Sequence, residues 1–163
     1  FIIYFFSQSF AVTDNLDGLT TGLLIFCLLA FWAISVQHLD TTLSVFIALW
    51  IGSLIAFLYF NVFPARIQLG RSGSLSFGAS LAVTGLLLGK SAALFIIGGI
   101  FVLEMITFVL SFSQNIIFKS AKYPFRPLHE YLLSRGWPEP KVMLRAWLAG
   151  IILAVFGLWL AGA

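Results

Sequence analysis

Residues 19–36 read LTTGLLIFCLLAFWAISV and contain no charged side chain. The hydrocarbon core of a bilayer is about 30 Å thick and is crossed by a helix of roughly 20 apolar residues. Apolar and polar residues do not alternate along this run, as they would in a strand of a membrane barrel. The run therefore predicts a membrane-spanning α-helix.

Five further apolar runs lie on either side of this one, at about 1–12, 43–60, 74–89, 91–117 and 146–162. The chain has 163 residues, of which 61% are hydrophobic and 9% charged. Soluble domains carry about a quarter charged residues. The sequence thus predicts an all-α polytopic membrane protein with about six transmembrane helices, forming a single integral membrane domain over residues 1–163. Because the short first run begins at Phe1, we expect the chain to be a piece of a longer protein.

The same composition excludes a soluble enzyme, a disordered tail and a secreted disulfide scaffold. Cys27 is the single cysteine and is expected to be a small buried apolar residue. The net charge of +3 is too small to indicate a nucleic-acid partner, so membrane lipid is the expected surroundings.

The basic residues are distributed unevenly among the predicted loops. Six spans place the loops at 13–18, 61–73 and 118–145 on one side of the membrane, and those at 37–42 and 89–91, with the C-terminus, on the other. The first set contains eight of the nine basic residues, and the second contains only Lys90. Basic loops face the cytoplasm, which predicts a multi-pass protein of the cytoplasmic membrane whose active face is cytoplasmic. The eight residues are Arg66, Arg71, Lys119, Lys122, Arg126, Arg135, Lys141 and Arg145.

Two carboxylates, Asp14 and Asp17, lie in the first of these loops. Carboxylate oxygens at a membrane boundary could bind a divalent cation, which in turn would bind a phosphate-containing substrate. The alternative is structural, with Asp17 as the N-cap of the helix that follows.

The second basic loop, residues 61–75, reads NVFPARIQLGRSGSL. Gly70, Arg71 and Ser72 precede a predicted helix, where backbone N–H groups and a guanidinium can bind a phosphate. The alternative is a loop whose arginines contact lipid headgroups.

Three other ionisable residues could carry chemistry. His129 in the third loop could donate, accept or bind a metal near neutral pH, or be merely solvated. Glu104 lies inside a predicted span, where an ionisable residue indicates either a functional site or a polar tie between helices. His38 lies in the opposite loop and is expected to be solvated.

Together, these motifs resemble those of the polyprenyl-phosphate N-acetylhexosamine-1-phosphate transferase family. Residues 13–20 are similar to its TDGLDGLA-type motif, residues 64–75 to its PAKIFMGDTGSL-type motif, and Glu104 to the acid of its FVIE-type motif. Residues 127–147 resemble a motif specific to its phospho-N-acetylmuramoyl-pentapeptide branch, with GWPEPK intact at 136–141.

The resemblance implies the C-terminal half of a ten-helix fold. Members of this branch transfer phospho-N-acetylmuramoyl-pentapeptide from UDP to undecaprenyl phosphate, forming lipid I for peptidoglycan, and require Mg²⁺. It implies metal contacts by Asp14 and Asp17 and substrate contacts by Asp17, Gly70, Arg71 and Ser72. His129 is implied as a substrate-binding and catalytic residue, and a homodimer is a further expected assembly.

The chain departs from the family pattern at several of its functional positions. Arg71 replaces the magnesium-binding aspartate, Gln68 replaces a phenylalanine that stacks on uracil, and Ala11 replaces an asparagine. Only His129 remains of a triple histidine, and an aspartate pair of the family falls outside the chain. Two alternatives therefore stand beside the transferase: a non-catalytic relative that binds polyprenyl phosphate or a partner, and a transferase for another UDP-N-acetylhexosamine.

Overall fold

A computed structural model describes residues 1–117 and 127–162, and within these ranges every regular element is an α-helix. The predicted all-α membrane class is confirmed. The helices are α1 (Ile2–Thr13), α2 (Leu19–Gln37), α3 (Thr41–Asn61), α4 (Gly70–Leu87), α5 (Ser91–Ile97), α6 (Gly99–Ile117), α7 (Leu128–Ser134) and α8 (Glu139–Gly162).

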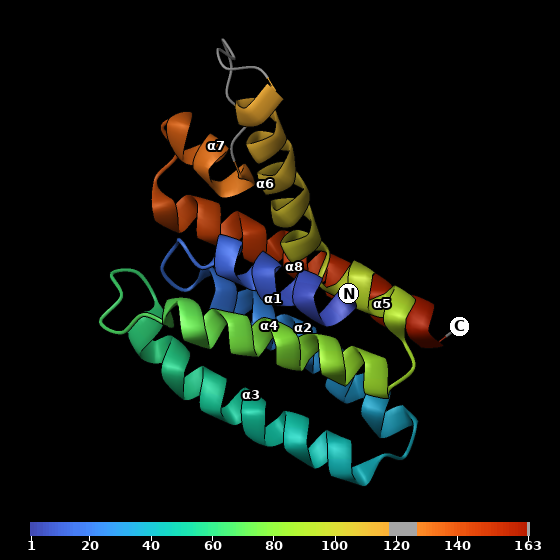
Figure 1. Cartoon of the computed structure of the whole chain (residues 1–163). Coiled ribbons are helices and arrows are strands. Elements are labelled where there is room, and N and C mark those ends of the chain that lie inside the picture. The colour runs from blue at the N-terminus through green and yellow to red at the C-terminus, as the bar shows by residue number, and fades with distance from the viewer. Residues whose placement is uncertain (118–126, 163) are drawn as a thin grey trace.

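The helices form a bundle from which one helix projects (Figure 1). In the bundle, α1 packs against α4 and α6, α2 packs against α3 and α8, and α5 packs against α8. The axis bends by 76° between α5 and α6, so α6 leaves the bundle, and α7 lies beside it (Figure 1). The run predicted as one span at 91–117 is therefore two helices.

The predicted number of about six membrane spans is too high. Each of the six apolar runs contributes to a helix, but three helices in the described ranges are long and apolar enough to cross a membrane, namely α2, α3 and α8. The bent pair α5–α6 would make four. Helix α1 has only 12 residues, and α4 begins with the polar stretch from Gly70 to Ser74, so apolar runs alone overstated the count.

Small residues allow α1 and α4 to approach closely. A Cβ atom added at Gly78 would lie 2.5 Å from the Phe6 carbonyl oxygen, so no larger residue fits there without moving backbone. Close approach through glycine is how membrane helices gain packing energy, since lipid is as apolar as the side chains. On another face of α1, the rings of Phe10 and Phe101 stack with centroids 3.8 Å apart.

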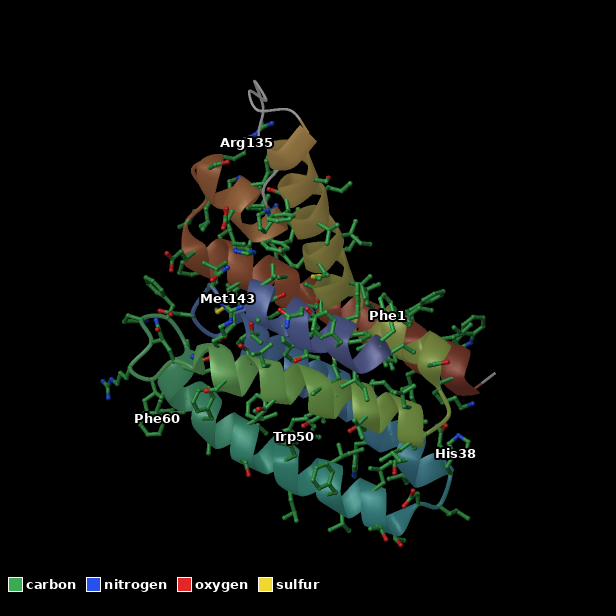
Figure 2. The ribbon with its side chains drawn as sticks, viewed as in Figure 1. Phe1, His38, Trp50, Phe60, Arg135 and Met143 are labelled. Carbon is green, nitrogen blue, oxygen red and sulfur yellow. The ribbon has the colours of Figure 1, made fainter. Side chains whose placement is uncertain are left out.

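The connections that the structure describes divide between the two ends of the bundle, and Lys119, Lys122 and Arg126 of the predicted third loop lie outside the described residues. A Cβ atom at Gly18 would lie 3.2 Å from Met143 Sδ and 3.4 Å from Val62 Cα, so three basic or acidic segments meet at one end. At the other end, Lys90 Nζ donates to the Ala161 carbonyl oxygen at 2.7 Å. Exposed His38 lies at this second end, away from Phe60, Met143 and Arg135 (Figure 2).

Candidate functional site

A cleft of about 700 Å³ opens at the end of the bundle where Asp14 and Asp17 lie. Its wall comes from α1, the 14–17 turn, Asn61 and residues 68–69, the start of α4, parts of α6 and α7, and Pro127. Four of the residues predicted from sequence line it: Asp14, Asp17, Gly70 and Arg71. Folding thus joins two motifs, residues 13–20 and 64–75, that are separated by more than forty residues in sequence.

Asp17 ties the two motifs together. Its Oδ2 accepts a hydrogen bond from the Ala65 N–H at 2.9 Å. The N-cap of α2 is Gly18, at φ +73°, and α2 has no side-chain cap. The interpretation of Asp17 as a helix cap was therefore wrong, because this carboxylate is used between segments.

Asp14 follows the last turn of α1, and its side chain is half-buried at the cleft. Burial raises the pKa of the Asp14 carboxyl to about 6, since removing a carboxylate from water disfavours its charged form. Near neutral pH this group can therefore exist in either protonation state.

Arg71 lies in the first turn of α4, directly after Gly70, whose φ of +73° favours glycine. The Arg71 side chain is exposed and forms no ion pair within the described ranges. Ser72 is also exposed but does not line the cleft. Three of the departures from the family pattern, Ala11, Gln68 and Arg71, line it.

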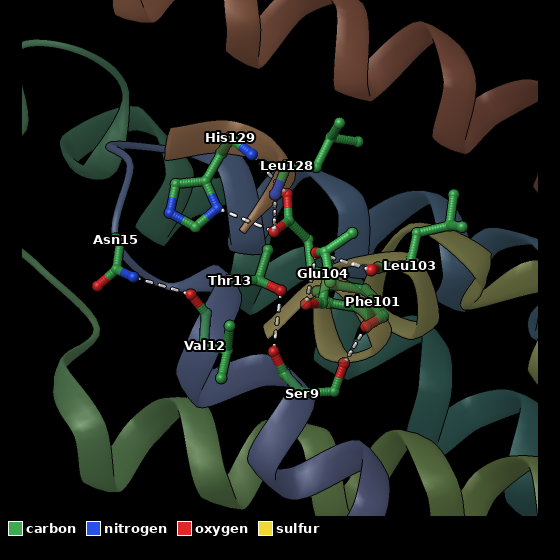
Figure 3. Close-up of polar contacts among 10 residues, drawn as sticks. Ser9, Val12, Thr13, Asn15, Phe101, Leu103, Glu104, Leu128 and His129 are labelled. Atoms are coloured by element: carbon green, nitrogen blue, oxygen red, sulfur yellow. Dashed lines mark hydrogen bonds and ion pairs between the residues drawn. The ribbon is translucent and has the colours of Figure 1, made fainter. Parts of the chain in front are cut away.

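His129 and Glu104 form a buried pair (Figure 3), and residues next to His129 in sequence line the cleft. Their side chains are 2% and 3% exposed, and His129 Nδ1 lies 3.0 Å from Glu104 Oε2. The hypothesis that His129 is merely solvated was wrong, and the alternative of Glu104 as a polar tie between helices is confirmed. His129 does not itself line the cleft, but Pro127 and Glu130 do.

The carboxylates do not by themselves make a magnesium site. No group of three or more His, Cys, Asp or Glu suited to a metal exists among the described residues. Asp14 and Asp17 share their cleft with the fixed positive charge of Arg71, which repels a cation and cannot ligate one. The donor set present therefore does not fit Mg²⁺.

The sequence model of Glycosyl transferase family 4 matches residues 1–89, the part of the chain that contributes most of the cleft. The chain belongs to glycosyl transferase family 4. The match covers both motifs that Asp17 joins.

Curated relatives are similar along almost the whole chain. The phospho-N-acetylmuramoyl-pentapeptide-transferase of Borrelia turicatae (strain 91E135) is 35% identical over 97% of this chain and 49% of its own length. The proteins of that name from Solibacter usitatus (strain Ellin6076) and Staphylococcus epidermidis (strain ATCC 12228 / FDA PCI 1200) are 32% and 33% identical, over 96% and 98% of this chain and 46% and 51% of their lengths. This glycosyl transferase family 4 chain spans about half the length of these relatives.

Sequence reasoning missed several polar residues of the cleft, among them Gln8 and Asn61. Buried Asn61 accepts from Thr21 Oγ1 at 2.8 Å and donates to the Ile67 carbonyl oxygen at 2.9 Å, which fixes the segment after α3. The available signal was a polar side chain inside or just after an apolar run, which holds for both residues.

Proposed function

We propose that this chain is the C-terminal half of a phospho-N-acetylmuramoyl-pentapeptide transferase. The complete enzyme would move the phosphosugar from UDP to undecaprenyl phosphate, making lipid I at the cytoplasmic face of a bacterial inner membrane. The observation that supports this proposal is the cleft in which Asp14, Asp17, Gly70 and Arg71 converge, because these residues belong to two separate family motifs.

In this proposal, residues of the cleft bind and orient the nucleotide-sugar. Arg71 supplies a fixed positive charge for the diphosphate, and Gly70 lets the backbone at the start of α4 approach it. Asp17 holds the two walls in register through Ala65. Because the donor set of the cleft does not suit Mg²⁺, we propose that magnesium stimulates this protein weakly. Ser72 and a second copy of the chain remain proposed contacts.

One observation favours a second candidate, a relative that binds polyprenyl phosphate without catalysis. Four of the departures from the family pattern, Ala11, Gln68, Arg71 and Glu130 of the altered histidine triplet, line one cleft, although Tyr131 of that triplet does not. A site that no longer catalyses a reaction would accumulate substitutions among its lining residues.

The test joins this chain to the half of the Borrelia turicatae relative that it does not match. Lipid-linked product is measured from UDP-N-acetylmuramoyl-pentapeptide and undecaprenyl phosphate, with and without Mg²⁺. We expect slow transfer, and we expect Arg71→Asp to raise both the rate and the dependence on magnesium. Asp17→Asn should lower turnover while the protein still extracts and melts normally.

Arg66→Asp is the matched control, since Arg66 is exposed in the same segment but does not line the cleft. It should leave transfer unchanged. Fast magnesium-dependent transfer that Arg71→Asp abolishes would contradict the proposed role of Arg71. Undecaprenyl phosphate binding without transfer, in the unmodified chimera and in Arg71→Asp, would establish the non-catalytic alternative.

A further inference from the structure

Glu104 of α6 receives three hydrogen bonds from α7. Its Oε1 accepts from the His129 backbone N–H at 3.1 Å, and its Oε2 accepts from the Leu128 N–H at 3.1 Å. The third partner is His129 Nδ1, 3.0 Å from Oε2. A backbone N–H can only donate, so both carboxylate oxygens act as acceptors here.

Two of these bonds fasten the start of α7. This helix has only seven residues, and its N-cap, Pro127, provides no side-chain bond. Glu104 supplies from a neighbouring helix the acceptor that a Ser or Asp cap would provide locally. The position of His129, the second residue of α7, is therefore fixed by the same carboxylate that contacts its ring.

The third bond determines which ring nitrogen carries the hydrogen. An ionised Glu104 carboxylate can only accept, so in that state Nδ1 is the donor, and in a neutral imidazole Nε2 is then a bare acceptor. His129 Nε2 is buried and has no hydrogen-bond partner within the described part of the chain. Buried polar atoms without a partner are rare and call for an explanation.

The ring edge bearing Nε2 faces the side on which Asn15 lies (Figure 3). Asn15, Pro127 and Glu130 all line the cleft, so His129 is flanked by cleft residues in sequence and in space.

We propose that Glu104 is a positioning residue that holds His129 as the neutral Nδ1–H tautomer and presents Nε2 as a hydrogen-bond acceptor to the occupant of the cleft. Because Nε2 is buried and His129 does not line the cleft, the occupant would have to displace the residues that cover Nε2 and offer it a hydroxyl or N–H group of a nucleotide-sugar. That second part rests on the proposed function, whereas the tautomer does not.

The experiment uses the chain with ¹⁵N-labelled histidine in lipid bilayers, observed by NMR at neutral pH. Only two imidazoles are present, and His38→Gln identifies the signals of exposed His38. Protonated and bare ring nitrogens have well-separated ¹⁵N shifts. We expect His129 to show a protonated Nδ1 and a bare Nε2. A protonated Nε2, in either the other tautomer or an imidazolium, overturns the proposal.

Two variants test the part played by Glu104. Glu104→Gln replaces one acceptor oxygen by an amide N–H₂, which can donate to Nδ1 of His129. The hydrogen of the imidazole should then move to Nε2, so the Nε2–H tautomer should become populated. Glu104→Asp keeps a carboxylate and should restore the Nδ1–H form in part. Glu139→Gln removes the acid from the first turn of α8, outside the cleft, and should change nothing. An unchanged tautomer in Glu104→Gln overturns the positioning role, because a purely structural tie would leave the tautomer alone.

Addition of UDP-N-acetylmuramoyl-pentapeptide to the joined protein tests the ligand contact. The Nε2 signal should shift towards its hydrogen-bonded value as the ligand saturates. Calorimetric binding without this shift overturns the contact. Absence of binding overturns the proposed function. The tautomer is measured without ligand, so that result does not depend on binding.

Discussion

Helices α2 and α3 follow each other in sequence and are almost equally apolar by mean hydropathy, yet they occupy different environments. In the most apolar stretch of α2, 72% of residues are buried inside the protein, compared with 17% in α3. α2 packs between α3 and α8, and α3 presents Val45, Leu49, Ile55 and Tyr59 on its outer surface. Because lipid accepts apolar side chains as readily as protein does, hydropathy identifies a span without identifying its neighbours.

The largest difference in the free energy of unfolding is expected when one glycine in each helix is replaced by a larger residue. A Cβ atom at Gly22 would lie 2.2 Å from Trp147 Cε2 on α8, whereas a Cβ atom at Gly52 of α3 meets nothing within 4 Å. Gly22→Leu should therefore cost about 1–3 kcal/mol or more, the typical cost of overpacking. The measurement is the free energy of unfolding in bicelles.

Gly52→Leu is the control for this comparison, and it should be neutral or slightly stabilising because leucine favours helix over glycine. Equal losses from both variants would contradict the packing difference between the two helices.

The second difference lies at the helix starts. Asp40 caps α3 by accepting from the Leu43 N–H at 3.0 Å, whereas α2 starts at Gly18 with no side-chain cap. Asp40→Ala should cost about 1 kcal/mol of unfolding free energy, measured as above. Asp40→Asn should cost little, since asparagine caps a helix about as well as aspartate. If Asp40→Asn lost as much unfolding free energy as Asp40→Ala, the charge of Asp40 rather than its capping bond would be responsible.

A smaller effect is expected from the hydrogen bond that joins the two helices, from Thr21 Oγ1 to Asn61 Oδ1 at 2.8 Å. Hydrogen bonds between membrane helices contribute about 0.6 kcal/mol on average, so Thr21→Val should destabilise by about that amount. Ser53→Ala on α3 removes only a bond to the Leu49 carbonyl of the same helix and should be silent. A loss as large in Ser53→Ala would contradict an interhelical role for Thr21.

The last effect is a dependence of stability on pH and concerns Asp14, in the turn before α2. Its pKa is about 6 in the folded protein against 3.8 ordinarily, so the folded state binds the proton more tightly. Stability should fall as pH rises from about 4 to about 6 and then level off. Unfolding midpoints measured across this range should show the slope, and Asp14→Asn should remove it. A slope that persists in Asp14→Asn would assign the effect to another group.

The helices themselves were largely predictable from sequence. Every apolar run contributes to a helix, and the meeting of residues 18, 62 and 143 at one end agrees with the charge distribution. The number of spans was not predictable, because a run such as 91–117 gives no sign of a 76° bend between Ile97 and Gly99. Such a bend depends on what the two halves pack against.

The candidate site divides in the same way. The sequence alone determined a helical membrane protein, the uneven distribution of its basic residues among the loops, and Asp14, Asp17, Gly70 and Arg71 as candidate site residues, since charge and hydropathy are properties of single residues. Only the tertiary structure decided that Asp17 bonds to Ala65 rather than capping α2, that His129 is buried, and that Glu104 holds it. A hydrogen bond joins two particular atoms at a short distance. Its partners therefore depend on how helices that are distant in sequence pack against one another.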